Sequence, residues 1–526
     1  MEAGCLRYTS LPGTSKLYSD FLYHFDRVRP FYHRHHLDVE ARREAAREIK
    51  YPAEMRHSMV AALRKYNGDS PNLHLLAQPG TVAVVTGQQV GLFSGPSYTV
   101  HKALTAARMA AELTAQGIPA VPIFWLATED HDFAEVNHVW SSDINHQPLR
   151  FEVPAVNGKP RPVGDIAPAS YPTAALRESL AAFPYGPEVA ALVEEAYQPG
   201  RTMGEAFAHL LRKLLPHAGL ILMDPLQPEI RALAAPFMRE AVQAAPELTQ
   251  ALAERNKTLA EAGYHAQVHV EDKTSLFFLL ENGERQVLRR EGSQYAAAAG
   301  RKFTPAELQA RAAELSPNAL LRPVMQDYLL PTIAYVGGPA ELAYLAQSEV
   351  IYRKLLGRFP LVMPRAGFTL LDSRSAKLME RYSLHLPDFF DGPAAVRERI
   401  AGKLVPPHLN ERFATTRADI TAAMAALDSD LCAFDSSLES AFQRSRAKIF
   451  HQLGKIEAKT AREALRRDAR AAAETAYLEG LLYPHKHLQE RFYTILPFLA
   501  QHGLDLVDRL AHHICLDCPD HLIVTP

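Results

Sequence analysis

Cysteine, net charge and long apolar runs are all scarce in this sequence, and each scarcity argues against a class of protein. Four cysteines in 526 residues are too few for a disulfide framework and fit a reducing compartment. A net charge of −2 gives no electrostatic basis for nucleic-acid binding. No run approaches the ~20 apolar residues of a membrane span, and the first ten residues lack a secretory signal pattern. We therefore expect a cytoplasmic protein that binds neither nucleic acid nor membranes.

Two nucleotide-binding signatures are also missing. The sequence contains neither GxxxxGK[ST] nor GxGxxG, so a P-loop is excluded and a nicotinamide or flavin site has little support. What remains is the composition of a globular protein, 47% apolar and 22% charged. A chain of this length exceeds the usual size of one compact core, which predicts a principal domain with insertions or appendages.

Residues 81–140 have the pattern of a strand, a glycine-rich loop, a helix and a second strand. The apolar run 82–85 does not alternate, which is typical of a strand covered on both faces. A helix is expected over residues 97–115, followed by a buried strand over 121–127. Such a unit closes as a right-handed crossover, so both loops lie at the carboxyl edge of a parallel sheet. Ligands bind at that edge in open α/β sheets.

Three further apolar runs, 220–223, 331–336 and 359–364, bring the expected parallel strands to about five, enough for a doubly wound α/β sheet. The Asn282-Gly283 pair between two strand-like runs predicts a β-hairpin. The resulting division of the chain is: N-terminal helices and the first half of the core, 1–140; a proline-rich, irregular insertion, 141–203; core, 204–263; a hairpin-containing second insertion, 264–317; the second half of the core, 318–388; a helical coiled-coil segment, 389–480; and C-terminal helices packing on the core, 481–526.

The helical segment suggests how the protein assembles. Residues 411–478 contain no proline and one glycine, Gly454, and apolar residues recur at spacings of three and four. Because such an apolar stripe must be buried, a homodimer interface is the leading expectation. An intramolecular hairpin packed on the core is the alternative.

The loop at residues 86–102 is the candidate anion site. A helix start attracts negative charge, and Lys102 lies one turn inside the expected helix, as in the HIGH-type signature that holds ATP phosphates. A structural turn is the alternative. Gly337-Gly338 precedes a second helix start, and Arg322 and Arg365 are the cations expected to grip a carboxylate or phosphate with two bonds.

The loop after the second strand holds four carboxylates within seven residues: Glu129, Asp130, Asp132 and Glu135. Their mutual repulsion favours a cationic ligand, either Mg²⁺ carried by a nucleotide or a substrate ammonium group, over a merely solvated loop. Zinc held by His131 and His138 lacks the usual spacing.

A CxxC pair, Cys515 and Cys518, lies among histidines near residue 515. Such a pair can bind zinc or act as a redox couple, but no second pair stands at finger spacing. A structural role is the simpler interpretation.

Several long strings together resemble one family. TGQQVGLFSGPSYTVHK, FWLATEDHDFAEVNHV, SPNALLRPVMQDYLLPTIAYVGGPAELAYLAQ and VMPRAGFT are similar to the bacillithiol biosynthesis cysteine-adding enzymes, the BshC family, and the likeness covers nearly the whole chain. The resemblance implies a Rossmann-like core of the nucleotidyltransferase (HUP) kind, two connective-peptide insertions and a coiled coil that forms a homodimer. It also implies the last step of bacillithiol assembly, in which L-cysteine is added to glucosaminyl-malate.

A free carboxylate must be activated before it forms an amide, so ATP and an acyl-adenylate are expected, with Mg²⁺ as a companion and no dedicated metal site. Asp130, His131 and Asp132 are the expected catalytic residues. The residues expected to bind substrate or nucleotide (ATP or ADP) are Thr86, Gly87, Gln88, Gln89, Gly95, Pro96, Tyr98, Thr99, Lys102, Glu129, Asn318, Arg322, Gln326, Gly337, Gly338 and Arg365. The alternatives are another ATP-dependent ligase or nucleotidyltransferase on the same core, or a non-catalytic nucleotide-binding coiled-coil scaffold.

Overall fold

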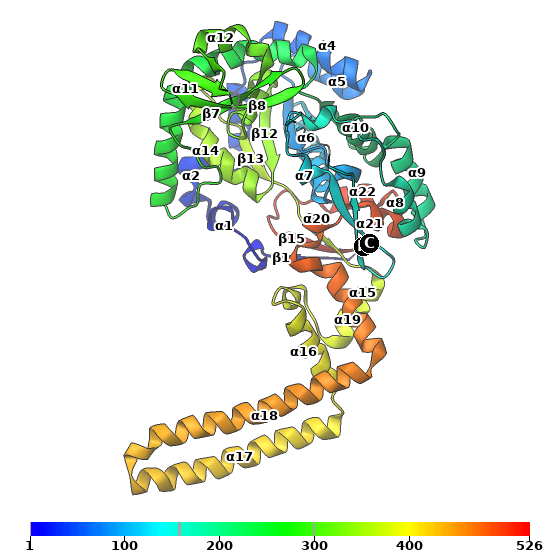
Figure 1. The fold of residues 1–526 in the computed structure, drawn as a ribbon, viewed down its shortest axis with the longest axis vertical. Helices are drawn as coiled ribbons and strands as arrows, with labels where there is room; N and C mark the ends of the chain where they lie inside the picture. The colour runs from blue at the N-terminus through cyan, green and yellow to red at the C-terminus, as the bar shows by residue number, and fades with distance from the viewer. Residues whose placement is uncertain (1, 156–158, 298–299) are drawn as a thin grey trace. The chain divides into compact units, whose positions relative to one another are not determined.

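The computed structural model describes residues 2–155, 159–297 and 300–526. The chain forms two compact units (Figure 1). One unit comprises Met1–Ile144, Pro148–Leu370 and Glu490–Pro526, and the other comprises Asn145–Gln147 and Leu371–Gln489. Within the described residues, no helix is both long and apolar enough to cross a membrane.

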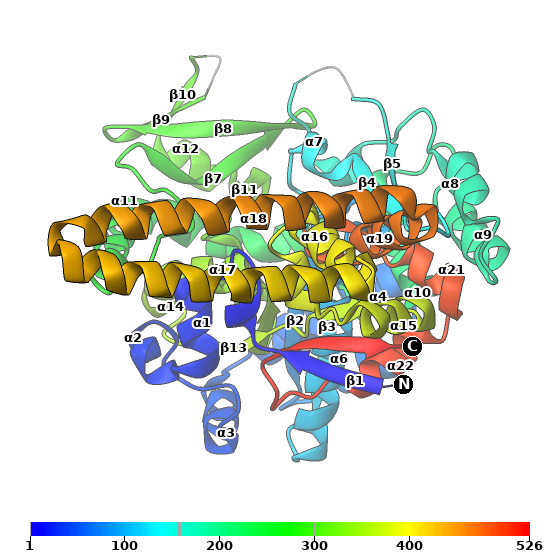
Figure 2. The same ribbon diagram turned by 90° about the horizontal axis from the view of Figure 1, so that it is seen from below.

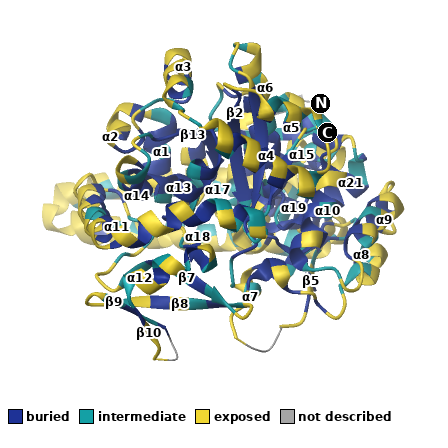
Figure 3. Cartoon of the chain, turned by 90° about the horizontal axis from the view of Figure 1, so that it is seen from above, coloured by how far each residue is buried: buried dark blue, intermediate teal, exposed yellow. Residues whose placement is uncertain are grey.

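A five-stranded parallel sheet lies at the centre of the first unit, in the order β13-β12-β2-β3-β6. Its strands are β2 (Val82–Gln88), β3 (Ala120–Leu126), β6 (Ile221–Met223), β12 (Thr332–Gly337) and β13 (Leu361–Pro364). These are the five apolar runs that the sequence indicates, so the predicted α/β core is confirmed. All residues of β3 are buried, and β2 is buried up to Gly87 (Figure 3). Burial on both faces explains why neither run alternates.

Helices connect and cover these strands. The predicted helix at 97–115 is confirmed as α6 (Tyr98–Ala115), and it packs on β2 and β3. The helix α14 (Pro339–Leu355) packs on β12 and β13. The same unit also contains the helices α10 (Met203–Leu214), α11 (Pro228–Glu261) and α13 (Arg322–Leu329).

The segment after β3 is more regular than its prolines indicate. It contains α7 (Phe133–Val136), an antiparallel pair of strands β4 (His138–Ser142) and β5 (Pro148–Glu152), and the helices α8 (Thr173–Leu180) and α9 (Gly186–Ala196). The expectation of an irregular insertion is therefore wrong in this respect. Most of the prolines lie between these elements or at their first positions, where a missing N–H costs little.

The second insertion forms an antiparallel sheet in the order β10-β9-β8-β7-β11. The predicted hairpin is confirmed: Glu281 pairs with Glu284, and the two-residue turn places Asn282 and Gly283 at φ 54° and 75°. Positive φ at both positions is the reason for Asn-Gly in this type of turn. The elements of this module are β7 (Thr274–Glu281), β8 (Glu284–Glu291), β9 (Gln294–Ala297), β10 (Lys302–Phe303), α12 (Pro305–Ala310) and β11 (Leu315–Pro317).

The two ends of the chain meet in a three-stranded sheet that the sequence did not reveal. In it, β15 (His521–Thr525) lies between β1 (Glu2–Leu6), which is antiparallel to it, and β14 (Phe368–Leu370), which is parallel. The expectation of helices alone at the C-terminus is therefore corrected. The helices near the two ends are α1 (Lys16–Tyr23), α2 (Arg29–Tyr32), α3 (Val39–Glu48), α4 (Ala53–Asn67), α5 (Pro71–Ala77), α20 (Gln489–Phe492), α21 (Leu496–His502) and α22 (Leu506–His513).

The second unit is helical. Figure 2 shows its two long helices, α17 (Pro407–Phe434) and α18 (Glu439–Arg467), side by side as an antiparallel hairpin. An ion pair of 2.6 Å joins Arg417 and Glu457 across the hairpin. The remaining helices are α15 (Ser373–Tyr382), α16 (Pro393–Leu404) and α19 (Ala469–Leu482). The predicted long helical segment is thus confirmed as a hairpin of two helices.

His521, the buried histidine of β15, should make the free energy of unfolding depend on pH. His521 is fully buried beside Thr369, and burial lowers the pKa of His521 to about 4, with the charges of Glu490 and Arg365 acting in opposite directions. An unfolded histidine titrates near 6.5. Because the unfolded state binds the extra proton first, stability is present above pH ~6.5 and is lost as pH falls toward 4.

The expected loss from His521 between pH 7 and pH 5 is about 2 kcal/mol. Urea unfolding of the wild type and of His521→Gln at both pH values measures it, because glutamine can still bond Thr369 but does not titrate. The variant should lose less stability on acidification, and equal losses in the two proteins would contradict the assignment.

Candidate active site

A cavity of about 550 Å³ lies at the carboxyl edge of the parallel sheet, where ligands of open α/β proteins bind. Its walls come from the loops after β2 and β3, the start of α14, the second insertion and α20. Many of the sequence-predicted residues line it, namely Gly87, Gln88, Gln89, Tyr98, Glu129, Asp130, His131, Asn318, Arg322, Gly338 and Arg365.

The other predicted residues do not line this cavity. They are Thr86, Gly95, Pro96, Thr99, Lys102, Asp132, Gln326 and Gly337. Thr86 is buried and donates its hydroxyl to the Val336 carbonyl, joining β2 to β12. Gln326 accepts a hydrogen bond from Arg322 and so orients a residue that does line the cavity.

The start of α6 differs from the expected anion site. The amides of Gly95, Ser97 and Thr99 donate to the carbonyls of Leu92, Tyr493 and Pro96. The loop reaches this conformation through Phe93, Ser94 and Gly95, all at positive φ, which turn it inward so that Phe93 and Ser94 are buried. An anion would compete with protein carbonyls for these amides, so this loop acts mainly as a structural turn.

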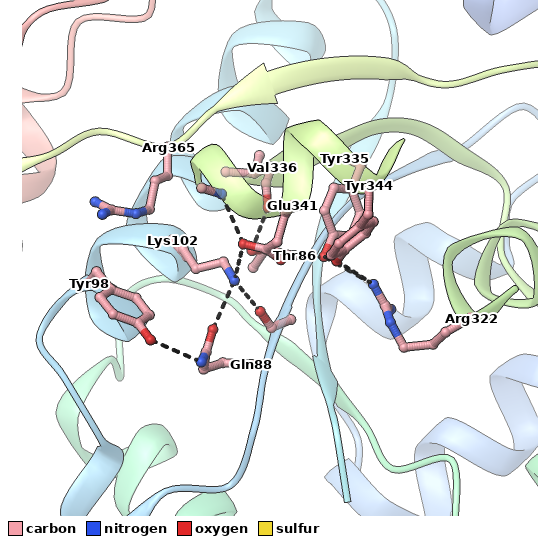
Figure 4. A network of polar contacts seen from close by, with 12 residues as sticks. Thr86, Gln88, Tyr98, Lys102, Arg322, Tyr335, Val336, Glu341, Tyr344 and Arg365 are labelled. Atoms are coloured by element: carbon pink, nitrogen blue, oxygen red, sulfur yellow. Dashed lines mark hydrogen bonds and ion pairs between the residues drawn. The ribbon is translucent and has the colours of Figure 1, made fainter. Parts of the chain in front are cut away.

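Lys102 is the buried centre of a polar network (Figure 4). Its ammonium lies 2.6 Å from a carboxylate oxygen of Glu341 and donates to Gln88 Oε1 at 3.0 Å and to the Gly87 carbonyl. Burial lowers the pKa of Lys102, and the charge of Glu341 opposes that effect. The same carboxylate accepts the Gly338 amide at the start of α14. Glu341 therefore neutralises both Lys102 and the second predicted helix-start site.

Of the cations predicted from the sequence, Arg322 is the one that remains available. Its guanidinium donates to the hydroxyls of Tyr335 and Tyr344, each at 3.2 Å (Figure 4). It also donates to Gln326 Oε1 at 3.1 Å. All three partners are neutral, and in the described part of the chain Arg322 forms no direct ion pair; the carboxylate of Glu341, which accepts the Tyr335 hydroxyl at 2.6 Å, helps against the effect of burial to raise the pKa of Arg322. The guanidinium also faces the ring of Trp125 at 5.7 Å. A largely desolvated guanidinium that is not directly paired with a carboxylate can still bind an anionic ligand.

The acidic loop supplies carboxylates at another part of the cavity wall. The Gln89 amide donates to Asp130 at 2.7 Å and to Glu135 at 2.8 Å. Burial raises the pKa of Asp130, but the Gln89 hydrogen bond and the Arg285 charge outweigh it and hold that pKa below its usual value. Asp130 is therefore ionised at neutral pH and can bind an ammonium group.

The other acids of this loop have different roles. Glu129 is buried and paired with Arg231 at 2.9 Å, and burial raises its pKa despite that partner. Asp132 is exposed, lies outside the cavity and accepts the Glu135 amide as the N-terminal cap of α7. Asp132 was expected to be catalytic, but in the structure it caps the start of α7.

Arg365 lines the cavity, but its guanidinium is already paired with a buried carboxylate of the protein. Both of its terminal nitrogens bond Glu490, at 2.6 and 2.9 Å, and His101 also contacts this carboxylate at 3.1 Å. The side chains of Arg365 and Glu490 are only 4% and 1% exposed. This arrangement corrects the expectation of a free bidentate arginine, because its two bonds are made within the protein.

Several lining residues were missed in the sequence, namely Trp125, Phe278, Arg285, Tyr335, Glu341, Tyr344 and Arg491. Arg285 follows the Asn-Gly turn of the hairpin, and Arg491 follows Glu490 in α20. The hairpin itself was predictable, but nothing local indicated that it reaches the cavity. Glu341 lay within the predicted GGPAE helix start, where its capping role was the available signal.

The C-terminal cysteines lie apart from this cavity. Cys515 is exposed, Cys518 is half-buried, and burial raises the pKa of Cys518. Among the residues with described positions, no cluster of three or more histidine, cysteine, aspartate or glutamate side chains could hold a metal ion.

A five-stranded parallel sheet with a charged cavity at its carboxyl edge and a helical appendage defines a Rossmann-like α/β protein. Two family models cover almost all of it: "Bacillithiol biosynthesis BshC, N-terminal Rossmann-like domain" matches residues 1–366, and "Bacillithiol biosynthesis BshC, C-terminal coiled-coil domain" matches residues 368–525. The chain belongs to the BshC family, which confirms the resemblance.

Curated relatives match this chain over all or nearly all of their lengths. Proteins from Solibacter usitatus and Koribacter versatilis are 55% and 38% identical, each over 100% of both chains. A protein from Salinibacter ruber is 32% identical over 97% of this chain and 96% of its own. All three carry the name "Putative cysteine ligase BshC".

Proposed function

We propose that this protein is a ligase that joins the carboxyl group of L-cysteine to the amine of glucosaminyl-malate, the last step of bacillithiol biosynthesis. Family membership supports this assignment, as do the names of the relatives. The observation that carries it is the polarity of one cavity, which presents the ionised Asp130 on one wall and Arg322, without a carboxylate partner, on another. An amine and an anionic group are the two features that the acceptor combines.

The anionic groups of the substrates would bind at the Arg322 wall. A planar guanidinium can hold a malyl carboxylate or a nucleotide phosphate with two bonds. Arg491 lines the same cavity and is exposed, so it adds a second cation. These residues fit ATP as a co-substrate through its phosphates. The start of α6 fits it less well, because the amides of Gly95, Ser97 and Thr99 already donate to protein carbonyls.

Amide formation would take two steps. The cysteine carboxylate attacks the α-phosphorus of ATP and releases pyrophosphate, which gives an acyl-adenylate. The acceptor nitrogen then attacks the acyl carbon, AMP leaves, and one proton is lost. That proton becomes acidic as the nitrogen lone pair forms the new bond, so a carboxylate within reach can accept it. Asp130 is suited to this role. An acceptor that it attracts as an ammonium first loses one proton to solvent, because an ammonium has no lone pair with which to attack, and Asp130 then takes the second proton once the new bond has formed.

The direct test is to incubate the purified protein with glucosaminyl-malate, cysteine and ATP and to detect bacillithiol by mass spectrometry. Product with release of AMP supports the full proposal. Product without ATP keeps the ligase assignment and removes the adenylate. AMP release with a different acceptor indicates another ligase or nucleotidyltransferase. If no acceptor gives a product, the remaining interpretation is a non-catalytic scaffold.

Replacing Asp130 with asparagine should lower kcat by about 100- to 10,000-fold, the usual contribution of a positioned proton acceptor. The amide keeps the shape of the side chain but neither attracts an ammonium group nor accepts a proton. The matched variant is Asp132→Asn, which changes an exposed acid outside the cavity. Steady-state kinetics should show only a small change in kcat for Asp132→Asn. Similar losses of kcat in both variants would show that Asp132 takes part in catalysis.

We further propose that the α17–α18 hairpin forms a homodimer interface. No residue of α17 is buried in the single chain, and α18 buries only Phe442 and Ala461. Large apolar side chains are exposed along it, including Phe434 at 84% and Ile456 at 58%. An apolar stripe of this kind is usually covered by a partner.

Replacing Ile456 with glutamate should convert the dimer to a monomer, because a carboxylate would be buried without a partner. Analytical ultracentrifugation measures the change. Arg462→Gln on the same helix alters the net charge by the same amount at another exposed position and should remain dimeric. A wild type that sediments as a monomer would rule out this interface.

A further inference from the structure

Arg285 makes an unusual set of contacts for a residue of an inserted hairpin. Its terminal nitrogens bond the Nδ1 of His131 at 2.9 Å and the Pro317 carbonyl at 3.0 Å, and its Nε donates to Ser316 at 3.3 Å. The guanidinium carbon lies 3.8 Å from the centre of the Phe278 ring. The side chain is only 8% exposed. Arg285 is therefore fixed in one position against the acidic loop.

The backbone holds this position from a second side. The Arg285 amide donates to the Pro160 carbonyl at 2.9 Å, and Lys159 and Glu284 form an ion pair beside it. Further along the same segment, the Gly164 amide donates to the Thr128 carbonyl, and a side chain at Gly164 would overlap Thr128. Both insertions thus fix the geometry between Arg285 and the loop that carries His131.

The contact with Arg285 determines where His131 carries its proton. A guanidinium only donates hydrogen bonds, so the Nδ1 of His131 must accept and is unprotonated. A neutral imidazole then has its proton on Nε2. The charged groups that face this ring are Arg285 from β8 and Asp130 and Asp132 from its own loop. Burial lowers the pKa of His131, and Arg285 lowers it further against the two carboxylates.

We propose that Arg285 is a positioning residue that keeps His131 neutral with its proton on Nε2. His131 then donates a hydrogen bond into the cavity, toward a carbonyl or phosphoryl oxygen of the bound substrate, and it does not compete with Asp130 for the proton of the amine. The roles in the cavity rest on the proposed function. The tautomer itself does not, because it is a property of the free protein.

Nitrogen-15 NMR of the histidine-labelled protein without substrate tests the tautomer. The difference spectrum between the wild type and His131→Gln identifies the His131 signals. We expect Nδ1 to resonate as an unprotonated nitrogen and Nε2 as a protonated one at pH 7. The reverse pattern in the wild type would overturn the proposal without reference to any variant or to ligase activity.

Replacing Arg285 with methionine should then give a mixture of tautomers and a higher pKa for His131, because the donor and the positive charge are both removed. Arg289→Met is the matched control: this arginine lies on the same strand, is exposed and should leave the His131 signals unchanged. Unchanged His131 signals in a folded Arg285→Met protein would contradict the proposal.

Kinetics test the role of the proton on Nε2. Glutamine can place an N–H near the position of Nε2, whereas asparagine places it near Nδ1. His131→Gln should therefore retain at least tenfold more kcat than His131→Asn. Equal losses together with the expected NMR pattern would refute hydrogen-bond donation and leave the tautomer assignment intact. Absence of ligase activity in the wild type would instead refute the proposed function.

Discussion

Replacing Arg322 with methionine should lower kcat/KM by about 30- to 150-fold without lowering the melting temperature. A charged hydrogen bond to a ligand is worth about 2–3 kcal/mol, and each 1.36 kcal/mol is a factor of ten in rate. The guanidinium has only neutral partners in the protein, Gln326, Tyr335 and Tyr344. Removing it therefore leaves no buried carboxylate without a counter-ion.

The conservative variant separates charge from geometry. Arg322→Lys keeps the positive charge but loses the planar fork that holds a carboxylate or phosphate with two bonds. We expect it to recover only part of the activity lost in Arg322→Met. A comparison of kcat/KM and melting temperature in both variants measures these effects. A strong fall in melting temperature with unchanged kinetics would show that Arg322 is structural.

Replacing Glu490 with glutamine should have the largest effect on stability, a loss of about 3–5 kcal/mol. The buried carboxylate accepts hydrogen bonds from both terminal nitrogens of Arg365 and from the Phe368 amide, and it also contacts His101. Glutamine would leave the Arg365 charge buried without its partner. Urea unfolding of the purified variant measures the change.

A double variant separates two contributions to the loss of stability: the loss of the ion pair itself and the burial of an unpaired Arg365 charge. Glu490→Gln combined with Arg365→Met removes both charges and should be more stable than Glu490→Gln alone. Glu40→Gln is the surface control, since its ion pair with Arg43 is exposed and should contribute less than about 1 kcal/mol. Additive effects of the two buried substitutions would show that the pair is not coupled.

Local patterns were sufficient to predict the sheet. The strands β2 and β3 are uninterrupted apolar runs because both of their faces are buried, and Asn282-Gly283 forms its turn from its own backbone preferences. The order of turns and helices then placed the loops at one edge of the sheet. The position of the cavity followed from these local signals.

The partners of each charged group could not be predicted in the same way. Arg285 and His131 are 154 residues apart, and Arg365 and Glu490 are 125 residues apart. A single arginine or glutamate in a polar segment has the same local pattern whether it is solvated or buried. The contacts at the start of α6 were unpredictable for a related reason, because the amide of Ser97 donates to the carbonyl of Tyr493, from near the end of the chain.

The pairing of β1 with β15 has a consequence for synthesis on the ribosome. β1 leaves the exit tunnel first but can pair only after β15 has been made, roughly half a minute to two minutes later at 5–20 residues per second. During this time β1 is an unpaired strand edge, and Arg365 emerges before the carboxylate of Glu490 has been made. A nascent chain that already contains the whole parallel sheet therefore still lacks the groups that close its first compact unit, so that unit reaches full stability only after β15 has been made.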